Sequence, residues 1–269
     1  MTPSSAVAPA IHATEVGDAG PRVVFLHGLF GQGRNFSQIA KALLPDLRSV
    51  LVDLPNHGRS AWTGSTDYVV VADAVAAWLR ATYGDEPSHV VGHSMGGKVA
   101  MVLALRHPDL VDRLVVADIS PGPSEGAGEF EHLLDSLARL DLAAIERRAD
   151  ADAMLAGDVD DERVRGFLLQ NLRSSTDGFQ WQANLELLRA GLATIGGFPD
   201  LAATFDHPVL WIAGELSPYV RPDDGPRMRE LFPRTRLVTL KGAGHWVHSE
   251  QPAAFVSALR VFLLADLGG

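Results

Sequence analysis

Cysteine is absent from this chain of 269 residues, which excludes disulfide bonds, cysteine-ligated zinc sites and a thiol nucleophile. Positive charge is also scarce: 23 Lys and Arg stand against 33 Asp and Glu, for a net charge of −10. The basic residues are scattered singly, without the stripe that binds nucleic acid or an anionic membrane. We therefore expect neither of these partners. The lack of cysteine is compatible with a reducing, cytoplasmic location.

Long hydrophobic runs are absent as well. No stretch approaches the roughly 18 apolar residues of a membrane-spanning helix. The first 20 residues have neither the basic nor the apolar region of a signal peptide. Hydrophobic residues still make up 46% of the chain, which is enough to bury a full core. We expect a soluble cytoplasmic protein with a loose N-terminal tail through about Ala10.

Short apolar runs alternate with longer helical patterns along most of the chain. The runs are Val23–Leu26, Val50–Val52, His89–Val91, Leu114–Val116, Val209–Ile212 and Arg236–Thr239. Their continuous apolar character is typical of strands buried on both faces, and therefore of a mostly parallel sheet covered by helices. In such α/β sheets the ligand lies beyond the carboxyl ends of the strands. The loops that follow the runs are where we expect the chemistry.

The segment 121–205 interrupts this alternation. Pro121-Gly122-Pro123 predicts a turn at its start, and helical patterns follow with no strand among them. We interpret the segment as an inserted helical cap over the active face; extra helices in the main layer are the alternative. The predicted division is a core of residues 1–120 and 206–269 and a cap of residues 121–205.

The pentapeptide Gly92-His93-Ser94-Met95-Gly96 lies between an apolar run and an apolar helical pattern. That is the context of the G-x-S-x-G turn, in which a serine projects from a sharp strand-to-helix connection. Side chains two positions before and after the serine would collide, and this explains the glycines. Ser94 is therefore the candidate nucleophile. The alternative is a chance match around a structural serine.

A general base is expected late in the chain, after the last strand. The sequence Gly242-Ala243-Gly244-His245-Trp246 follows the final apolar run, which makes His245 the candidate. His248 is the rival, but it lies where the terminal helix should begin. His57 is interpreted as a turn residue with a structural role.

The loop His27-Gly28-Leu29-Phe30-Gly31 follows the first long apolar run. In this kind of fold, such a loop supplies one backbone donor to the oxyanion, and the residue after the nucleophile supplies the other. The candidate donors are the N–H groups of Leu29 and Met95. The side chain of His27 is expected to brace the loop.

Together these motifs resemble the α/β-hydrolase superfamily along nearly the whole chain. A closer resemblance is to small bacterial esterases of the ybfF type and their mitochondrial relatives. It depends on His27–Gly31, Gly92–Lys98, Asp118–Pro121, Ser217–Val220 and Gly242–His248. The resemblance implies an α/β-hydrolase fold, with a mostly parallel central sheet flanked by helices, and a serine esterase activity.

The acid of the catalytic triad departs from the wider superfamily. Most members carry it after the penultimate strand, where this chain has Ser217, and a serine cannot hold the charge that stabilises an imidazolium. The ybfF-type resemblance implies Asp118 instead. Glu215 is the rival acid, and a role for Asp118 in capping the turn at Ser120 is the other alternative.

We expect hydrolysis of carboxylic esters with small to medium acyl groups through an acyl-enzyme on Ser94, with water as second substrate and no metal or cofactor. Candidate pocket residues are Phe30, Phe130, Leu134, Trp181 and Trp246; for those in the cap, plain packing is an equal alternative. Thioesterase, lactonase, carbon–carbon hydrolase and perhydrolase activities would use the same residues. A ligand receptor on a hydrolase fold is the non-enzymatic alternative. We expect a monomer or homodimer.

Overall fold

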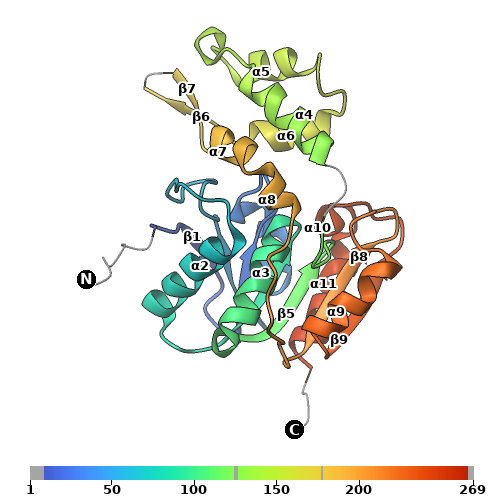
Figure 1. Cartoon of the computed structure of the whole chain (residues 1–269). Coiled ribbons are helices and arrows are strands. Elements are labelled where there is room, and N and C mark those ends of the chain that lie inside the picture. Colours follow the sequence, from blue (N-terminus) through green and yellow to red (C-terminus); the bar gives the residue numbers. More distant parts are fainter. Residues whose placement is uncertain (1–8, 124–126, 177, 266–269) are drawn as a thin grey trace, which may run out of the picture.

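The computed structural model describes residues 9–123, 127–176 and 178–265, and a seven-stranded sheet forms its centre (Figure 1). The strands are β1 (Ala13–Val16), β2 (Arg22–Leu26), β3 (Arg48–Val52), β4 (Ser88–His93), β5 (Val111–Ala117), β8 (Val209–Gly214) and β9 (Thr235–Leu240). Their order is β1-β3-β2-β4-β5-β8-β9. All neighbours pair in parallel except β1 and β3. The predicted fold class is confirmed; the antiparallel edge strand β1 was not predicted.

Helices cover both faces of the sheet because successive strand residues point to opposite sides. Val24 and Leu26 pack with α2 (Tyr68–Tyr83), α3 (Met95–Arg106) and α9 (Gly225–Leu231), whereas Val23 and Phe25 pack with α1 (Ser37–Ala42) and α11 (Pro252–Leu263). Shorter helical turns are η1 (Gly33–Phe36), η2 (Pro108–Leu110), η4 (Pro222–Asp224) and α10 (Val247–Glu250). None of the helices in the described ranges has the length and apolar character needed to span a membrane.

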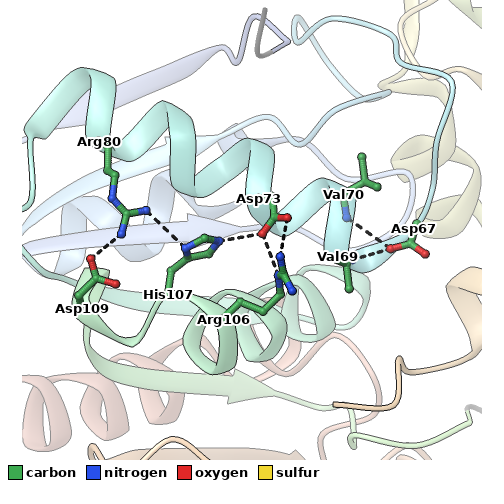
Figure 2. Close-up of polar contacts among 8 residues, drawn as sticks. All are labelled: Asp67, Val69, Val70, Asp73, Arg80, Arg106, His107 and Asp109. Carbon is green, nitrogen blue, oxygen red and sulfur yellow. Dashed lines mark hydrogen bonds and ion pairs between the residues drawn. The ribbon is translucent and has the colours of Figure 1, made fainter. Parts of the chain in front are cut away.

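A network of charged side chains joins α2 to the carboxyl end of α3 (Figure 2). The carboxylate of Asp73 accepts hydrogen bonds from Nε and Nη2 of Arg106, at 2.9 and 2.8 Å, and pairs with His107 Nε2 at 2.8 Å. Arg80, further along α2, forms an ion pair with Asp109. Partial burial raises the pKa of Asp73, but the bonds from Arg106 and His107 outweigh it and hold the pKa below its usual value.

The part of the chain from α4 to α7, between β5 and β8, lies above the carboxyl ends of the strands (Figure 1). We call the part from α4 to α8 the cap segment. It contains α4 (Ala127–Ala138), η3 (Leu142–Ala144), α5 (Arg148–Leu155), α6 (Glu162–Leu169), β6 (Leu172–Ser175), β7 (Gly178–Trp181), α7 (Leu185–Ala190) and α8 (Leu192–Gly196). Its apolar cluster includes Leu29 and Phe30 of the core, so the cap segment packs directly on the loop after β2.

The prediction that this segment contains no strand is wrong, because β6 and β7 form an antiparallel hairpin. Helix α6 ends at Leu169. Two short strands follow, and the sequence has an Asp-Gly pair whose glycine is the first residue of β7, which is a local signal for a hairpin. Leu172 and Trp181 pair across the hairpin.

Both connections to the cap segment meet at Lys98 of α3. Its Nζ donates to the carbonyl oxygens of Gly122, before the cap segment, and of Gly196 and Gly197, at its end, at 3.0, 2.8 and 2.7 Å. The side chain is almost fully buried, and burial lowers the pKa of Lys98 to about 8. One side chain of the core therefore ties the entry and the exit of the cap segment together.

Candidate active site

Ser94 occupies the turn from β4 to α3 in a strained backbone conformation, with φ 53° and ψ −123°. The turn leaves no space for a side chain two positions before or two positions after Ser94. A Cβ on Gly92 would lie 2.3 Å from the Gly96 carbonyl oxygen, and a Cβ on Gly96 would lie 2.3 Å from the carbonyl oxygen of Leu26. The glycines are therefore a steric requirement, and the strained turn directs the hydroxyl beyond the strand end.

His245 lies between Ser94 and Asp118. Its Nε2 is 2.9 Å from Ser94 Oγ, and its Nδ1 is 2.8 Å from Asp118 Oδ2. Ser94 follows β4, Asp118 follows β5 and His245 follows β9, so three strand ends bring the side chains together. This is the hydrogen-bonded order that allows a histidine to take a proton from a serine while a carboxylate stabilises the imidazolium.

The carboxylate of Asp118 is completely buried and well supplied with donors. Besides His245, it accepts hydrogen bonds from the backbone N–H of Gly214, at 2.8 Å, and from the hydroxyl of Ser217. Ser217 is the residue found where most superfamily members carry the acid, and here it donates to the carboxylate that replaces it. Such donors stabilise a buried negative charge.

Glu215, the rival acid, lies apart from His245. Its carboxylate accepts a hydrogen bond from the N–H of Gly242 at 2.9 Å. Within the described ranges it makes no hydrogen bond or ion pair with the imidazole. The geometry therefore supports Asp118 as the partner of the base.

Leu29 and Met95, the candidate oxyanion donors, line the same small cavity as Ser94. Met95 is the first residue of α3, and a helix offers no internal acceptor to its first N–H groups. Neither N–H donates a hydrogen bond to another residue in the described part of the chain. Leu29, Ser94 and Met95 line one small cavity, of about 30 Å³. An oxyanion formed at Ser94 would find these two donors.

The side chain of His27 braces the loop after β2, as the sequence suggested. Its Nε2 accepts a hydrogen bond from the N–H of Leu54 at 3.0 Å, so Nδ1 carries the proton and donates to the Gly28 carbonyl at 2.8 Å. Burial lowers the pKa of His27 to about 4. Burial, with repulsion from His27, lowers the pKa of His57 to about 3. Both imidazoles are thus neutral structural groups.

Sequence reasoning gave no role to two residues that surround the candidate base, His93 and Tyr219. His93 Nε2 lies 2.8 Å from the backbone carbonyl oxygen of His245, and the His93 ring is 4.7 Å from that of His248. The ring of Tyr219 is 4.2 Å from the His245 ring. His93 and Tyr219 fall within motifs that carried the family resemblance, which was the available signal. They fix the position of the loop and of the imidazole.

A cavity of about 190 Å³ opens from Ser94 and His245 between the core and the cap segment. Of the predicted pocket residues, Phe30, Phe130 and Trp246 line it, with Phe167 and Tyr219 among their neighbours. Leu134 and Trp181 are not among its lining residues. Leu134 is fully buried inside the apolar cluster of the cap segment, and Trp181 packs against that cluster from β7. The walls are mainly aromatic and aliphatic.

Polar side chains of the cap segment hold the loop that carries Leu29. Asn171 Nδ2 donates to the Phe30 carbonyl at 2.8 Å, and Gln170 Nε2 donates to the same oxygen at 3.1 Å. Gln32 Nε2 donates in turn to the Gln170 carbonyl at 3.2 Å. The sequence carried no signal for this bridge, since its partners lie about 140 residues apart.

A serine, a histidine and a buried carboxylate at the strand ends of a parallel sheet are the arrangement of serine hydrolases. The family model described as alpha/beta hydrolase fold matches residues 21–252, and the chain belongs to this family.

Individual relatives agree with this assignment. The chain is 39% identical over 258 residues to the sn-1-specific diacylglycerol lipase ABHD11 of Mus musculus, covering 92% of this chain and 82% of that protein. It is 33% identical over 241 residues to Esterase YbfF of Escherichia coli (strain K12), covering 90% and 92%. A solved structure of a marine microorganism esterase superposes with a TM-score of 0.91 at 31% identity, covering 94% of this chain and 99% of that one. The resemblance to ybfF-type esterases is confirmed.

Proposed function

We propose that this chain is a serine esterase that acts through an acyl-enzyme on Ser94. It is a carboxylic ester hydrolase, in agreement with the relatives named as esterases and lipases and with the matched fold. The observation that carries the proposed mechanism is the hydrogen-bonded series from Ser94 through His245 to Asp118. The proposed division remains a core of residues 1–120 and 206–269 with a cap of residues 121–205. A cytoplasmic location and a monomeric or homodimeric state stay predictions.

In the proposed mechanism, Ser94 Oγ attacks the carbonyl carbon of the ester while its proton passes to His245 Nε2. Asp118 stabilises the imidazolium, and the Leu29 and Met95 N–H groups bind the oxyanion. The C–O bond to the alcohol then breaks, and the alcohol leaves with the proton from His245. Water, deprotonated by the same imidazole, attacks the acyl-enzyme and releases the carboxylic acid and free Ser94.

The cavities around Ser94 indicate which esters fit. The larger, of about 190 Å³, is lined mainly by apolar side chains, and the smaller, of about 30 Å³, is closed by Met95 and Ile195. Ser94 borders both, so an ester carbonyl there would direct one substituent into each. The smaller cavity holds only a group the size of a water or two. We therefore propose neutral esters in which one substituent is short.

The test is a burst assay with p-nitrophenyl esters of increasing acyl length. The parent should release a burst of p-nitrophenol stoichiometric with enzyme and turn over short esters. Ser94→Ala should lose burst and turnover, whereas Ser257→Ala, at an exposed position on α11, should keep both. Absence of turnover and of any covalent acyl-enzyme in the parent would overturn the proposal and favour a ligand receptor.

A further inference from the structure

A second cavity, of about 380 Å³, lies between the β1–β3 edge of the sheet and the hairpin of the cap segment. Four arginines line it: Arg34, Arg59, Arg148 and Arg173. It shares no lining residue with the cavity that opens from Ser94 and His245. It is therefore a separate site, and in a chain with a net charge of −10 it gathers positive charge in one place.

The positive charge of this cavity is not balanced by the protein. Its one acidic lining residue, Asp53, has both oxygens engaged by backbone N–H groups, of Gly33 at 2.8 Å and of Arg59 at 2.9 Å. None of the four arginines forms an ion pair with a described carboxylate, in contrast with Arg106 and Asp73. Unpaired guanidinium groups that face one cavity favour an anionic ligand.

The four guanidinium groups fall into two kinds. Arg34 donates to the Gln170 carbonyl at 3.1 Å, and Arg148 donates to the carbonyls of Leu169 and Leu172, so both are held in position. The guanidinium groups of Arg59 and Arg173 donate to no residue within the described ranges. Their donors are available to a ligand. Planar guanidinium groups bind phosphate or carboxylate groups in a bidentate manner.

The cavity continues into a shallow hollow that shares Arg59, Arg173 and Gln182 with it and adds Trp62 and Trp181. The Trp62 side chain is 55% exposed, although its indole N–H donates to the Gln182 carbonyl at 3.1 Å. An exposed indole held in one orientation is a surface on which a planar ring can stack. The guanidinium groups of Arg59 and Arg173 therefore lie in the same hollow as the exposed indole of Trp62.

We propose that this cavity binds a small, soluble, multiply charged phosphate ester that carries a planar ring, of the nucleoside polyphosphate class. The phosphates contact Arg59 and Arg173, and the ring stacks on Trp62. The ligand and an ester bind at the same time, because the two cavities are lined by different residues. Gln32 and Gln170 line the new cavity and also bridge to the loop of Leu29, so the ligand touches the link between core and cap segment.

The test is isothermal titration calorimetry of the full chain with ATP, tripolyphosphate, adenosine and citrate, without divalent metal. ATP should bind with a Kd below about 1 mM, and adenosine and citrate should bind much more weakly. Arg59→Gln and Arg173→Gln should each weaken ATP about tenfold, the loss of one charge-assisted contact. Trp62→Ala should weaken ATP but not tripolyphosphate. The control is Arg229→Gln, at an exposed arginine on α9 beside the opposite end of the sheet.

Three outcomes would overturn the proposal. The first is the absence of binding heat, and of any thermal stabilisation, with ATP on the parent chain. The second is an equal loss of affinity in Arg229→Gln, which would reduce the effect to non-specific charge. The third is binding to vesicles that contain phosphoinositide without binding of soluble ATP, which would make the ligand a lipid headgroup. Because the arginine side chains are exposed, thermal unfolding of each variant should match the parent.

Discussion

The core and the cap segment hold their functional residues in different ways. In the core, Ser94, Asp118 and His245 follow strands that are packed into one sheet, and their positions depend on the pairing of those strands. The cap segment has its own apolar cluster and is joined to the core by polar side chains such as Lys98 and Asn171, which reach main-chain carbonyls. The reacting groups thus depend on the pairing of strands in one sheet, while the pocket walls depend on apolar packing against the loop after β2 and on these hydrogen bonds.

The largest expected effect is the loss of kcat when the proposed triad acid of the core, Asp118, is replaced. Asp118→Asn should lower kcat for a p-nitrophenyl ester by about 10⁴-fold, because an amide cannot stabilise the imidazolium. Glu215→Gln should leave kcat within about twofold, since an exposed charge bonded to Gly242 contributes little at a distance. Both variants should keep the cap segment and bind substrate. If only Glu215→Gln loses activity, the assignment of the acid is wrong.

The core should also be the more acid-sensitive region, because loss of solvent contact favours the neutral form of four of its histidines. Burial lowers the pKa of His27 and His248 to about 4 and of His57 to about 3, and holds the pKa of His93 well below its usual value. Between pH 6.5 and about 4 the unfolded chain binds more protons than the folded one, so the free energy of unfolding falls as pH falls. His27 and His248 each contribute up to about 3 kcal/mol of this loss.

Urea unfolding from pH 7 to pH 4.5 measures this sensitivity, with His248→Phe as the test variant. The ring of His248 packs between those of Phe36 and Phe255, which suits a phenyl group. The variant should lose stability with acid less steeply than the parent, by about 1.4 kcal/mol per pH unit. A slope equal to that of the parent would show that His248 is not buried as a neutral group.

The hydrogen bonds by which the core holds both ends of the cap segment are tested by Lys98→Met. The variant leaves the carbonyls of Gly122, Gly196 and Gly197 without their buried donor, and it should lower the free energy of unfolding by about 2–3 kcal/mol. KM should rise while kcat changes little, because the pocket walls move and the triad does not. Lys41→Met, at an exposed position on α1, is the control. A selective loss of kcat would instead place Lys98 among the groups that act on the reacting atoms.

The smallest effect is expected for Asp73→Asn, in the network between α2 and α3 (Figure 2). The pair with Arg106 is partly exposed, so its loss should cost about 1 kcal/mol in the free energy of unfolding. Because the network lies at the end of α3 opposite Ser94, kcat/KM should be unchanged. A change in kcat/KM would show that loss of the network between α2 and α3 is transmitted along α3 to Ser94.

The parts of the protein that could be predicted are those whose cause is local. Gly92 and Gly96 are glycines because of a clash within one turn, so a short motif reveals Ser94 as the candidate nucleophile. All six apolar runs fall in the sheet; five are buried because both faces of their strands are covered, whereas Arg236–Thr239 is exposed on the edge strand β9. The hairpin of the cap segment was missed although an Asp-Gly pair marks its turn, because its two strands of four residues are too short to show a clear strand period beside helical patterns.

What the sequence alone determined is the fold, the nucleophile candidate, the base candidate and the loop that faces them, because each follows from neighbours in the chain. The sequence left Asp118 and Glu215 both open as the acid, and the tertiary structure places the Asp118 carboxylate within hydrogen-bond distance of His245. Pairing of β5 with β8 brings Ser217 and Gly214 onto the Asp118 carboxylate, while Glu215 turns to Gly242. The cavity of Arg34, Arg59, Arg148 and Arg173 was likewise decided by tertiary structure, since charges scattered singly in a chain become a site only when folding gathers them.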